Sequence, residues 1–170
     1  MRSVPKSRLL VFRDTLTGKI KEEIRNRFLQ RGISADRILF DPPPGCERSH
    51  FVIYKAIDLL LDAFPFTGHT TVVEALWMGV PAITLAGNRF AGRMAASVLT
   101  RIGTPELIAR TPEQYVSLAA EWAEQGDRIE QFRSNARDRM RASPLCKGRE
   151  FTQGLEDAYR KMWQNWCAKV

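Results

Sequence analysis

The stretch IDLLLDAFPFTGHTTVVEALWMGVPAITL, residues 57–85, decides the fold class. Its apolar run over 57–62 predicts a strand, and the apolar spacing that follows predicts a helix over Thr70–Met78. Gly79 and the nearby Pro81 are typical of a helix end, and residues 81–85 predict a second strand. Two strands joined by a helix of this length are predicted to run parallel, with a right-handed crossover.

The same alternation extends outward in both directions. Upstream we predict strands over 9–12 and 37–40, a helix between 17 and 32, and a short helix over 49–55. Downstream we predict a helix over 89–102, a strand over 106–109 and then only helices, including 127–142 and 150–166. No repeat or long linker interrupts the pattern. The chain is therefore predicted to be one domain, residues 1–170, with an open parallel α/β sheet of Rossmann type and a helical tail over about 111–170.

Composition excludes several protein classes. Of 170 residues, 44% are hydrophobic and 26% are charged, which is typical of a globular domain. No run approaches the ~18 apolar residues of a membrane span, and Arg13 breaks the only apolar run near the N-terminus. We therefore expect a cytoplasmic protein without a membrane partner. Three cysteines and two histidines, widely spaced, predict neither a disulfide framework nor a metal centre.

The net charge of +7 has two interpretations. It can attract nucleic acid, or it can attract small anions such as nucleotide diphosphates. Much of the excess lies in predicted helices that also carry Glu and Asp, which is typical of a solvated helix face. Aromatic residues do not alternate with these arginines, so the sequence does not predict a nucleic-acid surface.

A ligand site is expected where the carboxyl ends of the strands meet the N-termini of helices. Neither common Gly-rich phosphate signature is present, so the candidate is the loop over 64–71. Gly68 permits close backbone approach, and Thr70 and Thr71 offer hydroxyl groups beside free N–H groups at a helix start. One turn further, Glu74 can accept hydrogen bonds from ribose hydroxyls. The alternative is that Thr70 is only an N-cap and Glu74 only a favourable charge near the helix start.

Three further polar residues lie in or after predicted strands. His50 follows the Pro-rich turn after the strand that ends at Phe40, so it also lies at a strand's carboxyl end. It can donate to a phosphate or pack beside a base, and it can equally be structural. Asp58 and Asp62, four residues apart on a strand, are interpreted as structural.

Several sequence blocks resemble one known family, glycosyltransferase family 41. These blocks are residues 61–71 with Gly68-His69-Thr70-Thr71, residues 74–81, residues 84–87, Pro105–Ala109 and residues 143–146. The family contains the tetratricopeptide-linked O-GlcNAc transferases and the Spindly-type enzymes. The resemblance runs from about Ser7 to Trp166, and the blocks are specific in combination.

The resemblance implies one lobe of a two-lobed GT-B enzyme. Such an enzyme transfers a sugar from a UDP-sugar, with UDP-GlcNAc as the expected donor, to protein Ser or Thr, with inversion and without a metal or other cofactor. It implies that His69, Thr70 and Thr71 cradle the diphosphate, together with Gly68. It also implies that Glu74, where the family commonly has Asp, holds the ribose, and that His50 contacts the nucleotide. It assigns no catalytic residue to this sequence.

The sequence also departs from the family pattern. The family's first strand and helix, with a lysine for the departing diphosphate, have no counterpart before Ser7, and the opposite lobe that binds the protein acceptor is missing. We therefore expect weak nucleotide binding and no efficient catalysis by this chain alone. An exposed sheet edge predicts either marginal stability or pairing with a second copy. The alternative function is a non-catalytic module that binds a nucleotide or a partner protein.

Overall fold

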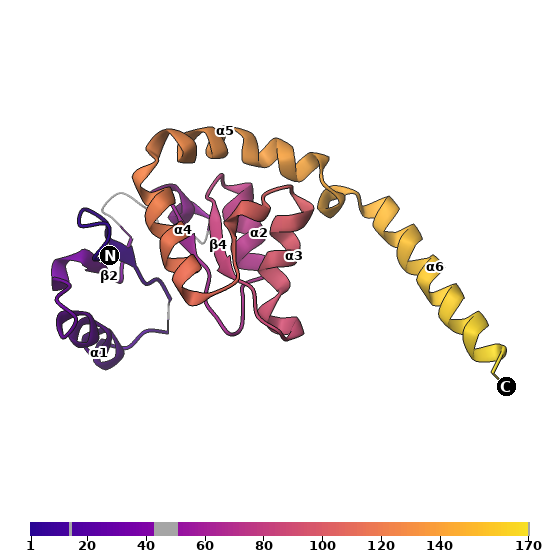
Figure 1. Cartoon of the computed structure of the whole chain (residues 1–170), viewed down its shortest axis with the longest axis horizontal. Coiled ribbons are helices and arrows are strands. Elements are labelled where there is room, and N and C mark those ends of the chain that lie inside the picture. Colours follow the sequence, from indigo (N-terminus) through magenta and orange to yellow (C-terminus); the bar gives the residue numbers. More distant parts are fainter. Residues whose placement is uncertain (14, 43–50, 170) are drawn as a thin grey trace.

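The computed structural model describes residues 1–13, 15–42 and 51–169 (Figure 1). Within them lie five short strands, which are β1 (Leu9–Leu10), β2 (Ile38–Leu39), β3 (Leu60–Leu61), β4 (Ala82–Leu85) and β5 (Ile108–Ala109). Six α-helices accompany them: α1 (Gly18–Leu29), α2 (Thr70–Trp77), α3 (Met94–Arg101), α4 (Pro112–Glu124), α5 (Gly126–Ala142) and α6 (Gly148–Cys167). The order of elements along the chain is that of a parallel α/β protein with a helical tail.

Every strand pair among the described residues is parallel. β1 pairs with β2, and β3, β4 and β5 form a second sheet in that order, with Leu60 opposite Ala82 and Thr84 opposite Ile108. Parallel strands connected through helices confirm the predicted α/β class. The sequence predicts one open sheet, whereas the described residues form two.

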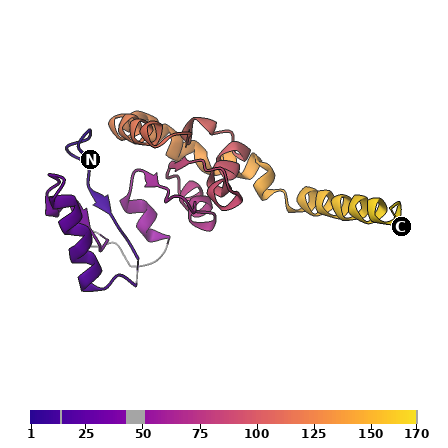
Figure 2. The same ribbon diagram turned by 60° about the horizontal axis from the view of Figure 1, so that its bottom comes forward.

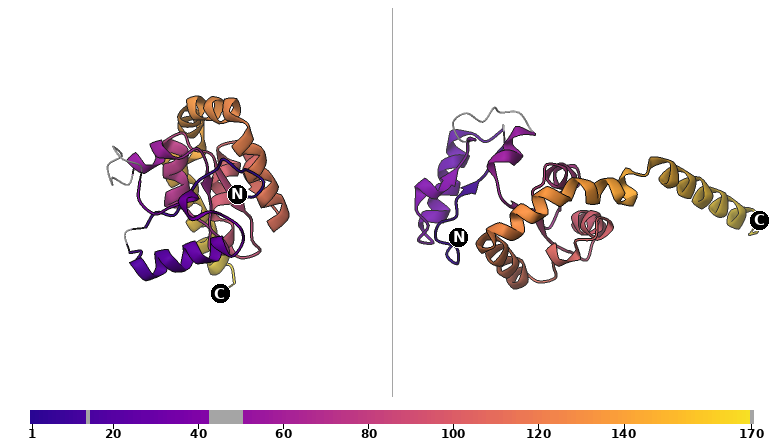
Figure 3. Two further views of the ribbon diagram at one scale, coloured as in Figure 1. Left: turned by 90° about the vertical axis from the view of Figure 1, so that its left-hand side faces the viewer. Right: turned by 90° about the horizontal axis from the view of Figure 1, so that it is seen from above.

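Side chains hold the two sheets together where backbone hydrogen bonds do not. Leu10 ends β1 and Phe12 follows it, and both pack with Leu60 of β3 in one apolar cluster around Tyr54 and Val80. A strand ladder requires backbones about 4.8 Å apart, whereas apolar side chains can join elements over a longer distance. The N-terminal unit of β1, α1 and β2 therefore lies beside the main body as a separate small layer (Figures 1 and 3).

The main core surrounds β4. Its consecutive residues Ala82, Ile83 and Thr84 are all fully buried, although successive strand side chains point to opposite faces. Both faces are thus covered, by helices that contribute Leu76, Leu99 and Trp122 among others. Such two-sided burial is usual for parallel sheets and leaves the ends of the strands as the exposed part of the sheet.

The last two helices differ in their burial. α5 crosses the main body and buries Ile129, Phe132, Ala136 and Met140, which share one helix face. α6 projects away from the body, and every described residue in it is exposed (Figures 1 and 2). Its large apolar residues, spaced three and four apart, form an uncovered stripe: Phe151, Leu155, Tyr159, Met162 and Trp166.

Several predicted elements are shorter than expected or of another type. The predicted strands over 9–12, 37–40 and 106–109 are reduced to the two residues each of β1, β2 and β5. The predicted helix over 49–55 appears in its described part as a 3-10 turn, Val52–Ala56. The predicted helix over 89–102 begins only at Met94, after a 3-10 turn over 90–92 in which Gly92 lies against Gly87. The predicted strand over 57–62 is reduced to Leu60–Leu61, the two residues that pair with β4. In the part of the chain that the structure describes, no helix is long and apolar enough to cross a membrane.

Candidate functional site

The predicted site residues lie together where α2 begins. β3 ends at Leu61, and the loop after it brings Gly68 to the N-terminus of α2, at the carboxyl end of the parallel strands. His69 is the N-cap residue, so the alternative that Thr70 is the N-cap is wrong, and Thr70 is instead the first helical residue. The side chains of His69, Thr70 and Thr71 are exposed. His50 lies outside the described residues.

Gly68 is required by the space around it. A methyl group built on its Cα would lie 2.6 Å from Thr71 Oγ1 and 2.9 Å from Asp62 Oδ1. Asp62 cannot give way easily, because its buried carboxylate is hydrogen-bonded to Thr84 and to Gly68 itself. The sequence predicts that a ligand approaches the backbone of Gly68 closely. In the structure, Thr71 and Asp62 approach it closely.

Asp62 anchors the loop from behind. Its Oδ1 accepts a hydrogen bond from the Gly68 N–H (2.7 Å), and its Oδ2 accepts one from the Thr84 hydroxyl on β4 (2.6 Å). Burial raises the pKa of the Asp62 carboxyl, and the hydrogen bonds from Thr84 and Gly68 oppose that rise. Asp58, by contrast, is exposed and lies 3.8 Å from Arg133 Nη2. Asp62 is therefore structural, as the sequence predicts. What it holds in place is the loop that carries the candidate site.

The loop is also tied to the next loop along the sheet. The Thr67 N–H and hydroxyl both donate to the carbonyl oxygen of Ala91, at 3.1 and 2.9 Å. On the other side, the Tyr115 hydroxyl of α4 donates to the carbonyl oxygen of Asp62 (2.9 Å), and its ring meets Phe64 edge to face. The donors at the start of α2 are therefore presented on a fixed backbone.

Glu74 is held in place by a residue that sequence reasoning missed. The buried Tyr54 hydroxyl lies 3.2 Å from Glu74 Oε2 and 3.2 Å from the carbonyl oxygen of Thr71, and it can donate to either. Burial and the nearby Glu74 charge raise the pKa of Tyr54, so its hydroxyl stays protonated as a donor. Glu74 itself is half-buried. No pattern in the sequence marks Tyr54, because its partner lies 20 residues away and only folding brings them together.

The arrangement suits an anion beside a hydroxylated group. The first N–H groups of a helix have no intrahelical acceptor, and the helix start carries a partial positive charge. At α2 these groups lie beside the exposed hydroxyls of Thr70 and Thr71 and the imidazole of His69. A phosphate can be bound there through several donors. One turn further along, the carboxylate of Glu74 can accept from a diol such as ribose.

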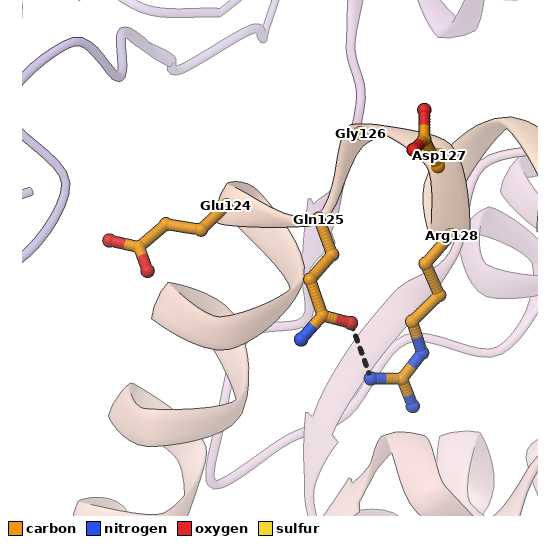
Figure 4. Close-up of a pocket in the computed structure, with 5 residues that line it drawn as sticks. All are labelled: Glu124, Gln125, Gly126, Asp127 and Arg128. Atoms are coloured by element: carbon orange, nitrogen blue, oxygen red, sulfur yellow. Dashed lines mark hydrogen bonds between the residues drawn. The ribbon is translucent and has the colours of Figure 1, made fainter.

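A surface hollow at another place in the fold lacks these features. It has a volume of about 430 Å³ and lies where α4 meets α5, lined by Glu124, Gln125, Gly126, Asp127 and Arg128 (Figure 4). Gln125 Oε1 accepts from Arg128, while Glu124 and Asp127 point away from that pair. Its charged groups do not converge, so this hollow is not the candidate site. Among the described residues, no group of three His, Cys, Asp or Glu side chains is placed to hold a metal ion.

Comparison with known sequences finds relatives that share one name. A protein of Hordeum vulgare named probable UDP-N-acetylglucosamine–peptide N-acetylglucosaminyltransferase SPINDLY is 37% identical over 166 residues, which are 97% of this chain and 18% of that protein. A protein of the same name from Arabidopsis thaliana is 38% identical over 173 residues, with the same coverage. The chain thus spans under a fifth of these relatives.

The structure gives the same relationship. A mutant of the O-GlcNAc transferase of Thermobaculum terrenum superposes with a TM-score of 0.87 at 33% identity, over 97% of this chain and 32% of that one. The sequence pattern of glycosyl transferase family 41 matches residues 1–155. The residues at the start of α2 are among those that carry the resemblance to this family. The chain belongs to glycosyl transferase family 41.

Proposed function

We propose that this chain is the donor-binding lobe of a protein O-glycosyltransferase that uses a UDP-sugar, with UDP-GlcNAc as the donor. The observation that carries the proposal is the start of α2, where His69, Thr70 and Thr71 are exposed beside free N–H donors and Glu74 is held by Tyr54. Membership of family 41 supplies the reaction class.

In this proposal each group has a defined task. The N–H groups and hydroxyls at the start of α2, with His69, bind the diphosphate. Glu74 accepts from the ribose hydroxyls, and Tyr54 fixes its orientation. His50 is proposed to contact the nucleotide as well. No metal ion and no further cofactor take part.

The reaction is proposed to be a single displacement with inversion. The Ser or Thr oxygen of the acceptor bonds to the anomeric carbon as the bond to the diphosphate oxygen breaks, and the hydroxyl proton passes to a base. Negative charge then grows on the departing diphosphate. The partial positive charge at the start of α2 stabilises this negative charge. Acyl- and phosphate-transfer sites use the same kind of electrostatic stabilisation. No catalytic base is assigned to this chain.

Isothermal titration calorimetry tests the donor site. UDP is expected to bind the chain more tightly than UMP, because the second phosphate meets the donors of α2. Thr71→Ala and Glu74→Ala should each weaken UDP binding about five- to tenfold, the equivalent of one lost hydrogen bond.

Matched controls separate a local effect from a general one. Thr152→Ala and Glu124→Ala make the same changes at exposed positions on α6 and at the end of α4, and they should leave UDP binding unchanged. A folded chain that binds no UDP at millimolar concentration would contradict the proposal. That result would favour the alternative of a non-catalytic partner-binding module.

A further inference from the structure

A second hollow lies beside the candidate donor site. Its volume is about 590 Å³, and it runs along α3 between the ends of β4 and β5. Three arginines line it, which are Arg93, Arg101 and Arg110. Its floor is apolar, with Met94 and the buried Ile108 among the lining residues. We refer to it as the arginine groove.

The groove is elongated. Arg93, Ser97 and Arg101 are spaced four residues apart, so they lie along one face of α3. Eight residues of helix span about 12 Å at 1.5 Å per residue. Arg110 directly follows β5, so it adds a guanidinium group from the strand side. The positive groups are thus distributed along a length and do not surround one point.

The charge of the groove is not balanced from within the protein. No acidic residue is among those that line it. Other arginines, such as Arg128 and Arg160, lie within 4 Å of a carboxylate, whereas none of the ion pairs between described residues involves Arg93, Arg101 or Arg110. Guanidinium groups bind carboxylates with good geometry, so this groove is complementary to an anionic ligand.

The shape and the floor favour a peptide among anionic ligands. A single phosphate needs donors that converge, and these arginines are spread over about 12 Å. An extended peptide covers that length with about four residues at ~3.3 Å each, and its side chains alternate between two directions. Acidic side chains can then reach the arginines while apolar side chains meet the floor at Met94 and Ile108 and the exposed ring of Phe90.

The groove and the donor site occupy the same edge of the sheet. The donor site follows β3, and one end of the groove is lined by Ala86 and Arg110, which directly follow β4 and β5 at the same carboxyl ends of parallel strands. From there the groove runs along α3 to Arg101. The loop that begins the groove is bonded to the loop that precedes α2, through Thr67 and Ala91. We propose that the arginine groove binds an acidic segment of the protein acceptor. This inference rests on the proposed function, because it takes the groove's ligand to be the protein that receives the sugar.

Fluorescence anisotropy of the full chain tests the groove. The probe is a fluorescein-labelled ten-residue peptide in which Glu and Leu alternate, with a second peptide carrying Gln in place of Glu. The Glu peptide is expected to bind, and the Gln peptide is expected to bind at least tenfold more weakly. The combined variant Arg93→Gln, Arg101→Gln, Arg110→Gln should lose at least tenfold in affinity for the Glu peptide.

A charge-matched control sharpens the test. Arg149→Gln, Lys161→Gln, Lys169→Gln removes three positive charges from the exposed C-terminal region and should bind the Glu peptide as the natural chain does. Equal losses in both triple variants would overturn the proposal, since binding would then reflect net charge. Displacement of the peptide by equimolar inorganic phosphate or by an RNA hexamer would also overturn it, because the ligand would be a phosphate group.

UDP titration of the same variants distinguishes the two proposals. The groove variant should bind UDP as the natural chain does, which also shows that it is folded. Peptide binding that persists in Thr71→Ala while UDP binding weakens would support two separate sites. Peptide binding without any UDP binding would contradict the proposed function and leave the groove as a binding site for acidic peptides.

Discussion

Asp62 lies behind the start of α2, and its buried carboxylate joins the loop to β4 through Gly68 and Thr84. Its removal leaves a backbone N–H and a buried hydroxyl without their acceptor. Such unsatisfied buried groups cost more than the hydrogen bonds contribute, because the folded protein offers them no water. The stability of the loop therefore depends on a residue that does not face the ligand.

Asp62→Ala is expected to lower the free energy of unfolding by about 2–4 kcal/mol. Asp58→Ala is the matched control, since Asp58 is 83% exposed and its ion pair with Arg133 is long. That change should cost less than about 0.5 kcal/mol. Urea unfolding followed by circular dichroism measures both. Equal values for the two variants would show that Asp62 does not anchor the loop.

Tyr54 acts on the site through Glu74, which makes the two residues energetically dependent. Tyr54→Phe removes only the hydroxyl and is expected to weaken UDP binding about threefold, while Tyr159→Phe on exposed α6 should have no effect. Combined with Glu74→Ala, the tyrosine change should add almost nothing to the loss of UDP binding, because the carboxylate that Tyr54 orients is already gone. Calorimetry of UDP binding to the natural chain, the two single variants and the double variant gives the coupling free energy between Tyr54 and Glu74. Full additivity would contradict a positioning role for Tyr54.

The site residues differ in how far the sequence reveals them. Gly68, His69, Thr70 and Thr71 are consecutive and lie in a strand-to-helix turn, so local pattern brings them together whatever the rest of the fold does. Glu74 follows at helical spacing from Thr70. The support from Tyr54 and Tyr115 comes from elements 20 and 53 residues away from their acceptors, and no local signal predicts it.

At the scale of elements, helix ends were predicted better than strand lengths. α2 was predicted over 70–78 and spans Thr70–Trp77, because Gly79 has a φ of 82° that few other residues adopt. The strands depend on neighbours that the local sequence does not show, and β3 keeps only the residues that pair with β4. The residues over 52–56 have an apolar pattern but form a 3-10 turn, which the sequence could not distinguish from a short α-helix.

Gly79 provides a test of helix termination. A Cβ at this position would lie 2.8 Å from Arg133 Cγ and 3.0 Å from the Arg133 carbonyl oxygen, in addition to the cost of positive φ. Gly79→Ala is therefore expected to destabilise the protein by about 2–4 kcal/mol. Gly103 also has a positive φ, 73°, but a Cβ there would meet no atom within 4 Å. Gly103→Ala should therefore lower the free energy of unfolding by only about 1 kcal/mol. Thermal unfolding compares them, and a larger loss at Gly103 would contradict this explanation.

At the scale of the whole molecule, the sequence predicts the helical tail but does not predict that its last helix is fully exposed. α6 buries none of its residues, so it contributes little to the stability of the body. A chain truncated after residue 147 should keep the melting temperature of the full chain within about 2 °C, as measured by differential scanning calorimetry. A large fall would show that the apolar stripe of α6 packs on the body in solution.

The division into two sheets leaves strand edges at which a second copy of the chain could pair. β1 and β3 each pair on one side with a described strand, and within the described residues no ladder joins them to each other. Such edges can accept another strand. Pairing with a second copy through an exposed edge therefore stays a prediction, as does the inactivity of this chain alone. Analytical ultracentrifugation of the purified chain tests the first.

The central claim is that the start of α2 binds the diphosphate of a nucleotide. A titration of the ¹⁵N-labelled chain with UDP, followed by amide NMR, tests it most directly. We predict that the largest chemical-shift changes fall on the amides of Gly68, His69, Thr70 and Thr71, and that UMP produces smaller changes. Shifts centred on the arginine groove or on the hollow at Glu124–Arg128, with none at α2, would contradict it.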